Sequence, residues 1–455
     1  MKRIFVLLIS TVLFMNCIFC GCGNQSAANP SDTDGSVMDK PTEVPAEKSI
    51  LSVYLVDTDA LYADAVSSFQ KQSQTVTLDV TSFTTYDAML RAADEAAATG
   101  EEPDVLLYNS NSMKGEVDGY TLAKSGKFLP LDSFLEQLDP AIYPKVLMDA
   151  GKVAGAQYFI PFSYNLLYAY TSQRLMTIKG YSPSDNLYHM LMNESESLME
   201  VSHKAPISMQ IYRPDPVNAF LDAAGVRLFD KNTGEVIADK AELEEICRFA
   251  KIVYDNMEKT AALNQKFAND FAGGTASFSF HTESYPFMNT IRYYHSMFPA
   301  GTGSPMVAMP YHKLNDPQAL CASIVCFGGV NVNTKSPEKA FDLLKYILDY
   351  PVSNNWKRGQ ATYEYHAPVN RSVYQTAVEE LSTTGGIGPV EITPLSKSIA
   401  EQLMANTDKI TNAIIPNTTL GIRLEAALTP YFMEQDSFDS CYDAALQELQ
   451  IYLNE

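Results

Sequence analysis

The stretch from residue 50 to residue 108 alternates between strand-like and helix-like patterns, and this alternation constrains the fold more than any other feature. Residues 50–56 form a continuous β-favouring apolar run, residues 76–80 alternate, and residues 105–108 form a further apolar run. The segments between them carry apolar side chains at the spacing of amphipathic helices, and Gly100 is expected to end the second helix. Strands separated by single helices favour right-handed crossovers and a mainly parallel sheet in an α/β fold.

Polar side chains follow the first and third of these strands. In parallel sheets, ligands bind beyond the carboxyl ends of the strands. We therefore take as candidate ligand contacts the residues just after each strand: Asp57, Asp59, Tyr62, Asn109 and Ser110. A carboxylate there accepts hydrogen bonds from ligand hydroxyls or pairs with a cation. The alternative for Asp59 is that it caps the following helix.

Two later segments add to the organisation of the chain. Residues 158–170 are apolar and aromatic but contain Pro161, which marks an edge, a bend or a crossing between lobes. Further on, residues 323–332 read as a strand, and a helix carrying an apolar face follows them. Ser336 suits the N-cap of that helix and Pro337 its first position.

Length and charge exclude several classes of protein. The chain has 455 residues. Its body, of about 400 residues, is larger than a single hydrophobic core usually supports, so we expect two lobes. The formal net charge of -21 argues against nucleic acid and against anionic membrane surfaces as partners.

The N-terminus predicts export. Lys2 and Arg3 precede an apolar run over residues 4–19, which is too short and too often interrupted to span a membrane. The following Gly21-Cys22 pair resembles the lipobox of bacterial lipoproteins, in which the Cys is lipidated and becomes the mature N-terminus. The alternative is a plain cleaved signal peptide. Residues 22–49 are polar and contain proline and acidic side chains, so we expect a flexible tether.

Four of the seven cysteines lie in the body, and we expect them to be buried and free. An offset of five residues places Cys321 and Cys326 on opposite faces of a strand, which disfavours a bond between them. A core of this size does not need disulfides.

Six segments in consecutive order resemble the extracellular solute-binding proteins of ABC importers, in the group that includes maltose- and other sugar-binding proteins. One is Gly100-Glu101-Glu102-Pro103-Asp104-Val105, which matches the Gly-x-x-Pro-Asp-Val turn of that family. The other five are residues 128–135, 151–168, 272–280, 328–346 and 367–373. The resemblance covers nearly the whole body.

The resemblance implies a periplasmic-binding-protein-like α/β fold with two lobes that close around a small solute, for which we expect a sugar or oligosaccharide. It also implies delivery to permease subunits, a monomeric body, and neither catalysis nor a cofactor. The boundaries that we expect are a signal peptide over 1–21, a tether over 22–49, lobe 1 over 50–162 and 316–380, and lobe 2 over 163–315 and 381–455.

The aromatic pattern departs from that family. Sugar-binding members usually carry tryptophans in the cleft, whereas this chain has one Trp and places His281, Glu283 and Tyr285 where Trp is expected. Its 26 tyrosines offer a substitute, because a phenol combines an apolar face with a hydrogen-bonding tip. The remaining candidate ligand contacts are tyrosines at expected loops or crossings, with packing as the alternative role for each: Tyr164, Tyr212, Tyr363 and Tyr365.

Three other readings stay open. His281-x-Glu283 and Glu364-x-His366 could contribute metal ligands, but a spacing of two is unspecific, and we expect no metal. An extracellular carbohydrate-active enzyme would need two carboxyls at a fixed separation, and no catalytic motif is present. A ligand sensor or adhesion lipoprotein could use the same fold without transport.

Overall fold

The computed structural model describes most of the body of the chain. The described residues are 48–57, 60–113, 118–183, 185–190, 192, 207–210, 216–251, 280–283, 291, 294–296, 298–299, 303–351, 366–383 and 393–455. All of them belong to one unit, residues 47–455. Within these ranges, no helix combines the length and the apolar character needed to cross a membrane.

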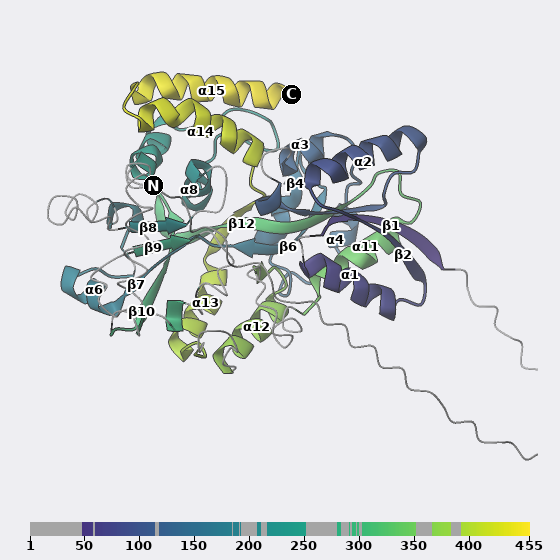
Figure 1. Ribbon diagram of the computed structural model, residues 1–455, viewed down its shortest axis with the longest axis horizontal. Coiled ribbons are helices and arrows are strands. Elements are labelled where there is room, and N and C mark those ends of the chain that lie inside the picture. Colours follow the sequence, from purple (N-terminus) through teal and green to yellow (C-terminus); the bar gives the residue numbers. More distant parts are fainter. Residues whose placement is uncertain are drawn as a thin grey trace, which may run out of the picture. The chain divides into compact units, whose positions relative to one another are not determined.

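The predicted alternation of strands and helices is confirmed (Figure 1). The elements are β1 (Ser49–Val56), α1 (Ala60–Gln72), β2 (Val76–Phe83), α2 (Tyr86–Thr99) and β3 (Val105–Asn109). β1 pairs in parallel with both β2 and β3. Gly100 ends α2 in the left-handed conformation, with φ 74°, which glycine adopts at low cost.

A large sheet contains these strands and continues with strands from later in the chain. Its order is β13-β6-β12-β3-β1-β2, and β11 and β14 also pair with β12. The later strands are β6 (Phe159–Asn165), β11 (His312–Lys313), β12 (Asp316–Val330), β13 (Ala367–Pro368) and β14 (Ile410–Ile414). β12 runs antiparallel to β3 and β6 and parallel to β14. The sheet is therefore parallel in its first part and mixed overall.

A second, smaller sheet has the order β10-β7-β9-β8. Its strands are β7 (Tyr168–Ser172), β8 (Ile207–Gln210), β9 (Phe280–Glu283) and β10 (Met306–Pro310). β6 ends at Asn165 in the large sheet, and β7 begins at Tyr168 in the small one. The aromatic run around Pro161 is thus divided between two sheets. Pro161 is tolerated because the pairs of β13 with β6 involve only Ser163 and Tyr164, so the ladder does not require an N–H from this proline.

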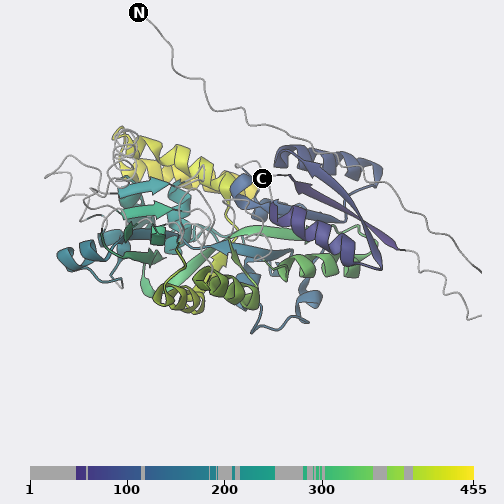
Figure 2. The same ribbon diagram turned by 60° about the horizontal axis from the view of Figure 1, so that its bottom comes forward.

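Helices cover both faces of the large sheet. Figure 1 shows α2 on one side of β1 and β2, and α1 with α11 on the other; α11 contacts β6 and β12. The helices of the middle and the last part are α3 (Gly119–Lys124), α4 (Asp132–Leu135), α5 (Lys145–Met148), α6 (Gln173–Lys179), α8 (Pro216–Ala224), α11 (Pro337–Leu348), α12 (Arg371–Thr383), α13 (Lys397–Asp408), α14 (Thr418–Phe432) and α15 (Phe438–Asn454). α14 and α15 lie side by side in both views (Figures 1 and 2).

The structure tests several predictions about single residues in the body of the chain. Pro337 occupies the first turn of α11 as predicted. Ser336 occupies the N-cap position as predicted, but its side chain makes no capping hydrogen bond. The four body cysteines are buried and free, as predicted. Burial raises the pKa of the Cys321 thiol to about 12, which disfavours the reactive thiolate.

Candidate functional site

The carboxyl ends of β1 and β3 lie at the same edge of the large sheet, as expected for parallel strands. At this edge, Asp57 is exposed, and its backbone N–H donates to the carbonyl of Phe83 at 2.8 Å. Among the described residues, no hydrogen bond or ion pair engages the Asp57 carboxylate. Asp57 therefore presents a negative charge to solvent at the position where sequence analysis predicts a ligand contact.

Asn109 and Ser110 occupy the same edge but use their side chains locally. The Asn109 Oδ1 accepts a hydrogen bond from the backbone N–H of Asn111 at 3.0 Å, which caps a short 3₁₀ turn, η1 (Ser110–Ser112). The Ser110 hydroxyl donates to the carbonyl of Ile324 in β12 at 2.9 Å. Both side chains are buried. These contacts favour a structural role in shaping the edge.

Tyr62 is fully buried under the same edge. Its hydroxyl donates to the carbonyl of Tyr108 in β3 and lies 3.3 Å from the carbonyl of Phe327 in β12. The hydroxyl thus ties α1 to two central strands. This geometry favours packing over ligand contact for Tyr62.

A polar pair stabilises the end of β6, where the chain leaves the large sheet. The Nδ1 atom of His366 lies 2.8 Å from Oδ1 of Asn165, and both side chains are buried. Burial lowers the pKa of His366 to about 3, so the imidazole is neutral and its Nδ1–H donates to the amide oxygen. Tyr164, the neighbouring candidate, is 1% exposed and its ring packs on Tyr374. The crossing between β6 and β7, residues 166–167, therefore begins beside a buried and uncharged hydrogen-bonded pair.

A second hydrogen bond holds the start of β7. The amide of Asn406 in α13 donates to the hydroxyl of Tyr168 at 2.8 Å. Sequence reasoning missed Asn406, because an asparagine inside a helical pattern carries no local sign of a partner 238 positions away. Both sides of the crossing are thus fixed by residues distant in sequence.

The register of the small sheet places further candidates at this crossing. Glu283 of β9 lies opposite Tyr168 of β7, and in the parallel pair β8–β9 it lies beside Gln210. His281 lies two positions earlier in β9, opposite Tyr170. Consequently β8 and β9 both end at the edge where the chain enters from the large sheet.

The register of the large sheet points to the same place. Asn109, at the end of β3, lies opposite Cys326, which also lies opposite Ser163 of β6. The carboxyl end of β3 is therefore level with the end of β6. The ends of β3 in one sheet and of β8 and β9 in the other all adjoin the crossing.

Several predicted site residues lie outside the described residues: Asp59, Tyr212, Tyr285, Tyr363, Tyr365 and the lipidation candidate Cys22. For His281 and Glu283 the structure describes the backbone position. Within the part of the chain that the structure describes, no group of three or more His, Cys, Asp or Glu residues is arranged to hold a metal ion.

Comparison with solved structures identifies the fold. A substrate-binding protein of an ABC transporter from Listeria monocytogenes, solved in complex with cycloalternan, matches with a TM-score of 0.55 and 14% identity, over 89% of this chain and 99% of that one. A sugar transporter protein from Rhizobium etli, in an open conformation, matches with a TM-score of 0.58 and 15% identity, over 88% and 99%. An extracellular solute-binding protein of family 1 from Alicyclobacillus acidocaldarius gives 0.58 and 13%, over 90% and 99%.

Comparison of sequences adds no closer relative. No protein-family model matches the sequence, and no curated protein matches it. The structural matches nevertheless span nearly the full length of the solved proteins and agree with the resemblance seen in the sequence. The chain therefore has the two-lobed α/β fold of the extracellular solute-binding proteins of ABC transporters.

Proposed function

We propose that this protein is the solute-binding component of an ABC importer and that it captures a carbohydrate between two lobes. The observation that carries the proposal is the convergence of strand ends from both sheets on the crossing between β6 and β7. A ligand there contacts elements of both sheets at once. In sheets of this kind the loops after the carboxyl ends of the strands carry the binding residues.

Carbohydrate is the ligand class that the likenesses and the residues favour. The Listeria protein was solved with cycloalternan, and the Rhizobium protein is described as a sugar transporter. In this chain, Asp57 offers a carboxylate that accepts hydrogen bonds from hydroxyls, and Glu283 ends β9 on the other sheet. Tyr212 and Tyr285 follow β8 and β9 within two residues, where a phenol face can stack on a sugar ring.

Capture follows from a shift between open and closed arrangements of the lobes. We propose that residues 166–167, between β6 and β7, and residue 311, between β10 and β11, are crossings between the lobes. A solute that touches both lobes only when they are closed shifts the equilibrium by its difference in affinity for the two states. These crossings replace the boundaries expected at residues 162–163 and 315–316. The other lobe boundaries remain part of this proposal, as does delivery of the solute to a permease.

The test of binding uses the chain from residue 22 with Cys22→Ser, screened by thermal shift. The panel contains monosaccharides, linear and cyclic oligosaccharides, amino acids, peptides and metal ions. A solute at a hundred times its Kd adds about 2.7 kcal/mol to the free energy of unfolding and raises the melting temperature. A response to carbohydrates alone supports the proposal. A response confined to the other classes would refute the carbohydrate ligand, and silence across the panel would favour a sensor or adhesion role.

Variants then locate the site. We expect Asp57→Asn and Tyr285→Ala each to weaken binding of the carbohydrate about tenfold or more, because each removes one ligand contact. Asp79→Asn is the matched control, since Asp79 is exposed on β2 of the same sheet, away from its carboxyl end. Equal affinity in Asp57→Asn, Tyr285→Ala and the control would place the site elsewhere.

We also propose that Cys22 carries the lipid anchor. A lipidated Cys22 would tether the body to the outer face of the cell membrane through residues 22–49, since buried acyl chains bind by the hydrophobic effect. Cells grown with labelled palmitate should label the wild-type chain and a Cys20→Ala variant but not Cys22→Ala. Labelling of Cys22→Ala would exclude this residue as the anchor.

A further inference from the structure

An aromatic pair lies where β1 and β2 approach their carboxyl ends. The rings of Tyr54 in β1 and Phe83 in β2 are tilted against each other, with 5.0 Å between their centroids and an interplanar angle of 57°. Both side chains are partly exposed. The register sets Val56 of β1 beside Phe83, and Tyr54 lies two positions before Val56, so the two rings share one face of the sheet. We call Tyr54 and Phe83 the aromatic platform.

The first turn of α2 lies on the same face of the sheet, above β3. Tyr86 at the start of α2 is buried and stacks on Tyr108 of β3, with 6.0 Å between ring centroids. Tyr54 pairs in register with Leu106 of the parallel β3, so Tyr108 lies on the same face as Tyr54. The platform lies above β1 and the edge strand β2, where both of its side chains keep part of their surface exposed.

The platform adjoins the charged position of the proposed site. The backbone N–H of Asp57 donates to the Phe83 carbonyl at 2.8 Å, which fixes Asp57 at the end of β2. The Asp57 side chain is exposed. Like the Asp57 carboxylate, the Tyr54 hydroxyl makes no hydrogen bond to any residue that the structure describes. A carboxylate, a phenol hydroxyl and two aromatic rings therefore meet at one corner of the large sheet.

This combination of groups suits one pyranose ring of a carbohydrate. The faces of a pyranose carry C–H groups, which pack on aromatic rings, and its rim carries hydroxyls, which donate to a carboxylate and exchange hydrogen bonds with a phenol. Small-ligand sites commonly combine aromatic walls with a few placed polar groups. A metal ion would use the carboxylate of Asp57 but gain little from the adjacent rings. The corner therefore favours a sugar over a bare cation.

We propose that the aromatic platform stacks on a pyranose unit of the solute while Asp57 binds the hydroxyls of the same unit. The inference rests on the proposed carbohydrate function and assigns two further binding residues, Tyr54 and Phe83, in the large-sheet lobe. Aromatic rings contact the C–H surface of a pyranose whatever the order of its hydroxyls. The platform therefore adds affinity for pyranoses as a class.

Substitutions that keep an apolar side chain but remove the ring test the platform. The probes are glucose, linear glucose oligosaccharides and cycloalternan, followed by the other carbohydrates of the thermal-shift panel. Affinity is measured by calorimetry on the chain from residue 22 with Cys22→Ser, and melting temperatures check that each variant folds. Phe83→Leu and Tyr54→Leu remove one ring each, and Phe83→Tyr keeps the ring. Tyr346→Leu is the matched control, because Tyr346 is a partly exposed ring that packs on Phe69 of α1, and α1 ends before the amino end of β2.

We expect Phe83→Leu and Tyr54→Leu each to weaken carbohydrate binding about three- to tenfold, because each removes one ring contact. Phe83→Tyr and the control should bind like the unmodified chain. Equal affinity in the two leucine variants and the control would overturn the platform while leaving carbohydrate binding intact. An equal loss in Phe83→Leu and Phe83→Tyr would also overturn it, since the ring would then make no difference. Absence of binding by the unmodified chain to every carbohydrate would refute the proposed function and this inference together.

Discussion

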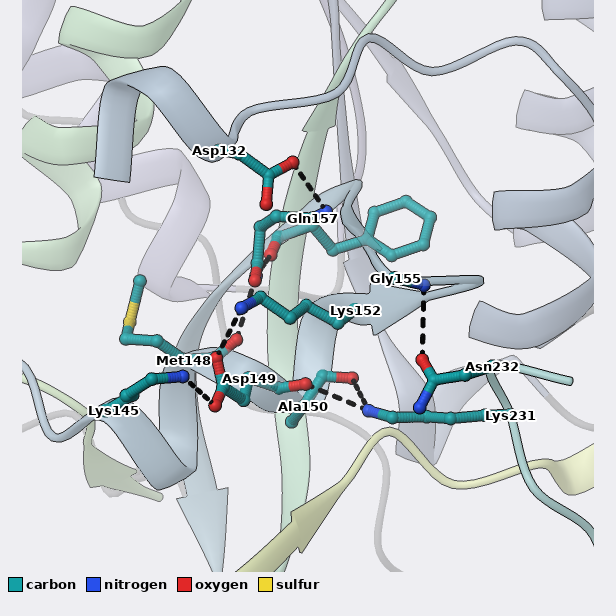
Figure 3. A network of polar contacts seen from close by, with 11 residues as sticks. Asp132, Lys145, Met148, Asp149, Ala150, Lys152, Gly155, Gln157, Lys231 and Asn232 are labelled. Carbon is teal, nitrogen blue, oxygen red and sulfur yellow. Dashed lines mark hydrogen bonds and ion pairs between the residues drawn. The ribbon is translucent and has the colours of Figure 1, made fainter. Parts of the chain in front are cut away.

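Lys231→Met should change how the stability of the protein depends on pH. The Lys231 ammonium is partly buried and donates to the carbonyls of Asp149 and Ala150 (Figure 3). This burial lowers its pKa from 10.5 to about 8. In the unfolded chain the amine keeps its ordinary pKa. Between these two values the unfolded state binds more protons than the folded state, so the free energy of unfolding rises with pH in this window. Methionine has a similar length and removes the titration.

The expected size follows from the two pKa values. For one group with pKa about 8 in the folded state and 10.5 in the unfolded state, the contribution is nearly zero at pH 7. At about pH 9.5 it reaches about 2 kcal/mol, and a folded pKa one unit higher would reduce it to about 1 kcal/mol. The difference in the free energy of unfolding between wild type and Lys231→Met should therefore grow by about 1–2 kcal/mol from pH 7 to about pH 9.5.

Urea unfolding at several pH values measures this difference directly. Subtracting the variant from the wild type cancels the titration of other groups, including the lysines whose pKa is raised by ion pairs, such as Lys345. Lys145→Met is the matched control, because the Lys145 side chain is 71% exposed and pairs with the same Asp149. The wild-type minus Lys145→Met difference should stay flat. A flat difference for Lys231→Met as well would refute the lowered pKa of this partly buried ammonium.

Three substitutions test buried hydrogen bonds and close packing in the fold. Tyr452→Phe should lower the free energy of unfolding by about 1–3 kcal/mol in urea, because the Tyr452 hydroxyl donates to both oxygens of the buried Asp118 carboxylate at 2.9 Å; no loss would mean that water replaces it. Gly151→Ala should lower the melting temperature by the equivalent of about 1–3 kcal/mol, since its Cβ would lie 2.1 Å from the Phe159 carbonyl oxygen, and an unchanged temperature would show that the backbone around Gly151 can shift. Tyr62→Phe should cost about 1 kcal/mol and leave carbohydrate affinity unchanged in calorimetry; weakened binding would return Tyr62 to the ligand contacts.

The first five elements could be predicted because their signals are local. The buried run of β1, the spacing of apolar residues in α1 and α2, and the left-handed Gly100 each report on the conformation of their own segment. The same reasoning gave the mainly parallel start of the sheet, since short strand–helix–strand units admit few topologies. It could not give the antiparallel pairing of β12 with β3. The paired residues are more than 200 positions apart, and no pattern in the sequence indicates that they meet. The division of the aromatic run between β6 and β7 is hidden for the same reason.

The candidate site shows why residue type is a weaker guide than burial. Tyr62, Asn109, Ser110 and His366 all have side chains suited to ligands, yet each is buried and engaged with the protein itself. A sequence does not state which polar groups the fold needs for its own hydrogen bonds, because that depends on which backbone groups become buried. Asp57 differs in being exposed.

This difference changes where specificity should be sought. If the polar groups of the large-sheet edge mostly serve the fold, the described residues of that edge offer a bound solute little beyond its shape, the charge of Asp57 and the aromatic platform. Under the proposed function, discrimination between solutes should then depend largely on the segments that follow β8 and β9, which contain Tyr212 and Tyr285. Loops tolerate substitution more readily than strands, so a fold shared at about 14% identity is compatible with very different ligands. The lobe that carries the small sheet is therefore where exchange of residues between related proteins should transfer ligand preference.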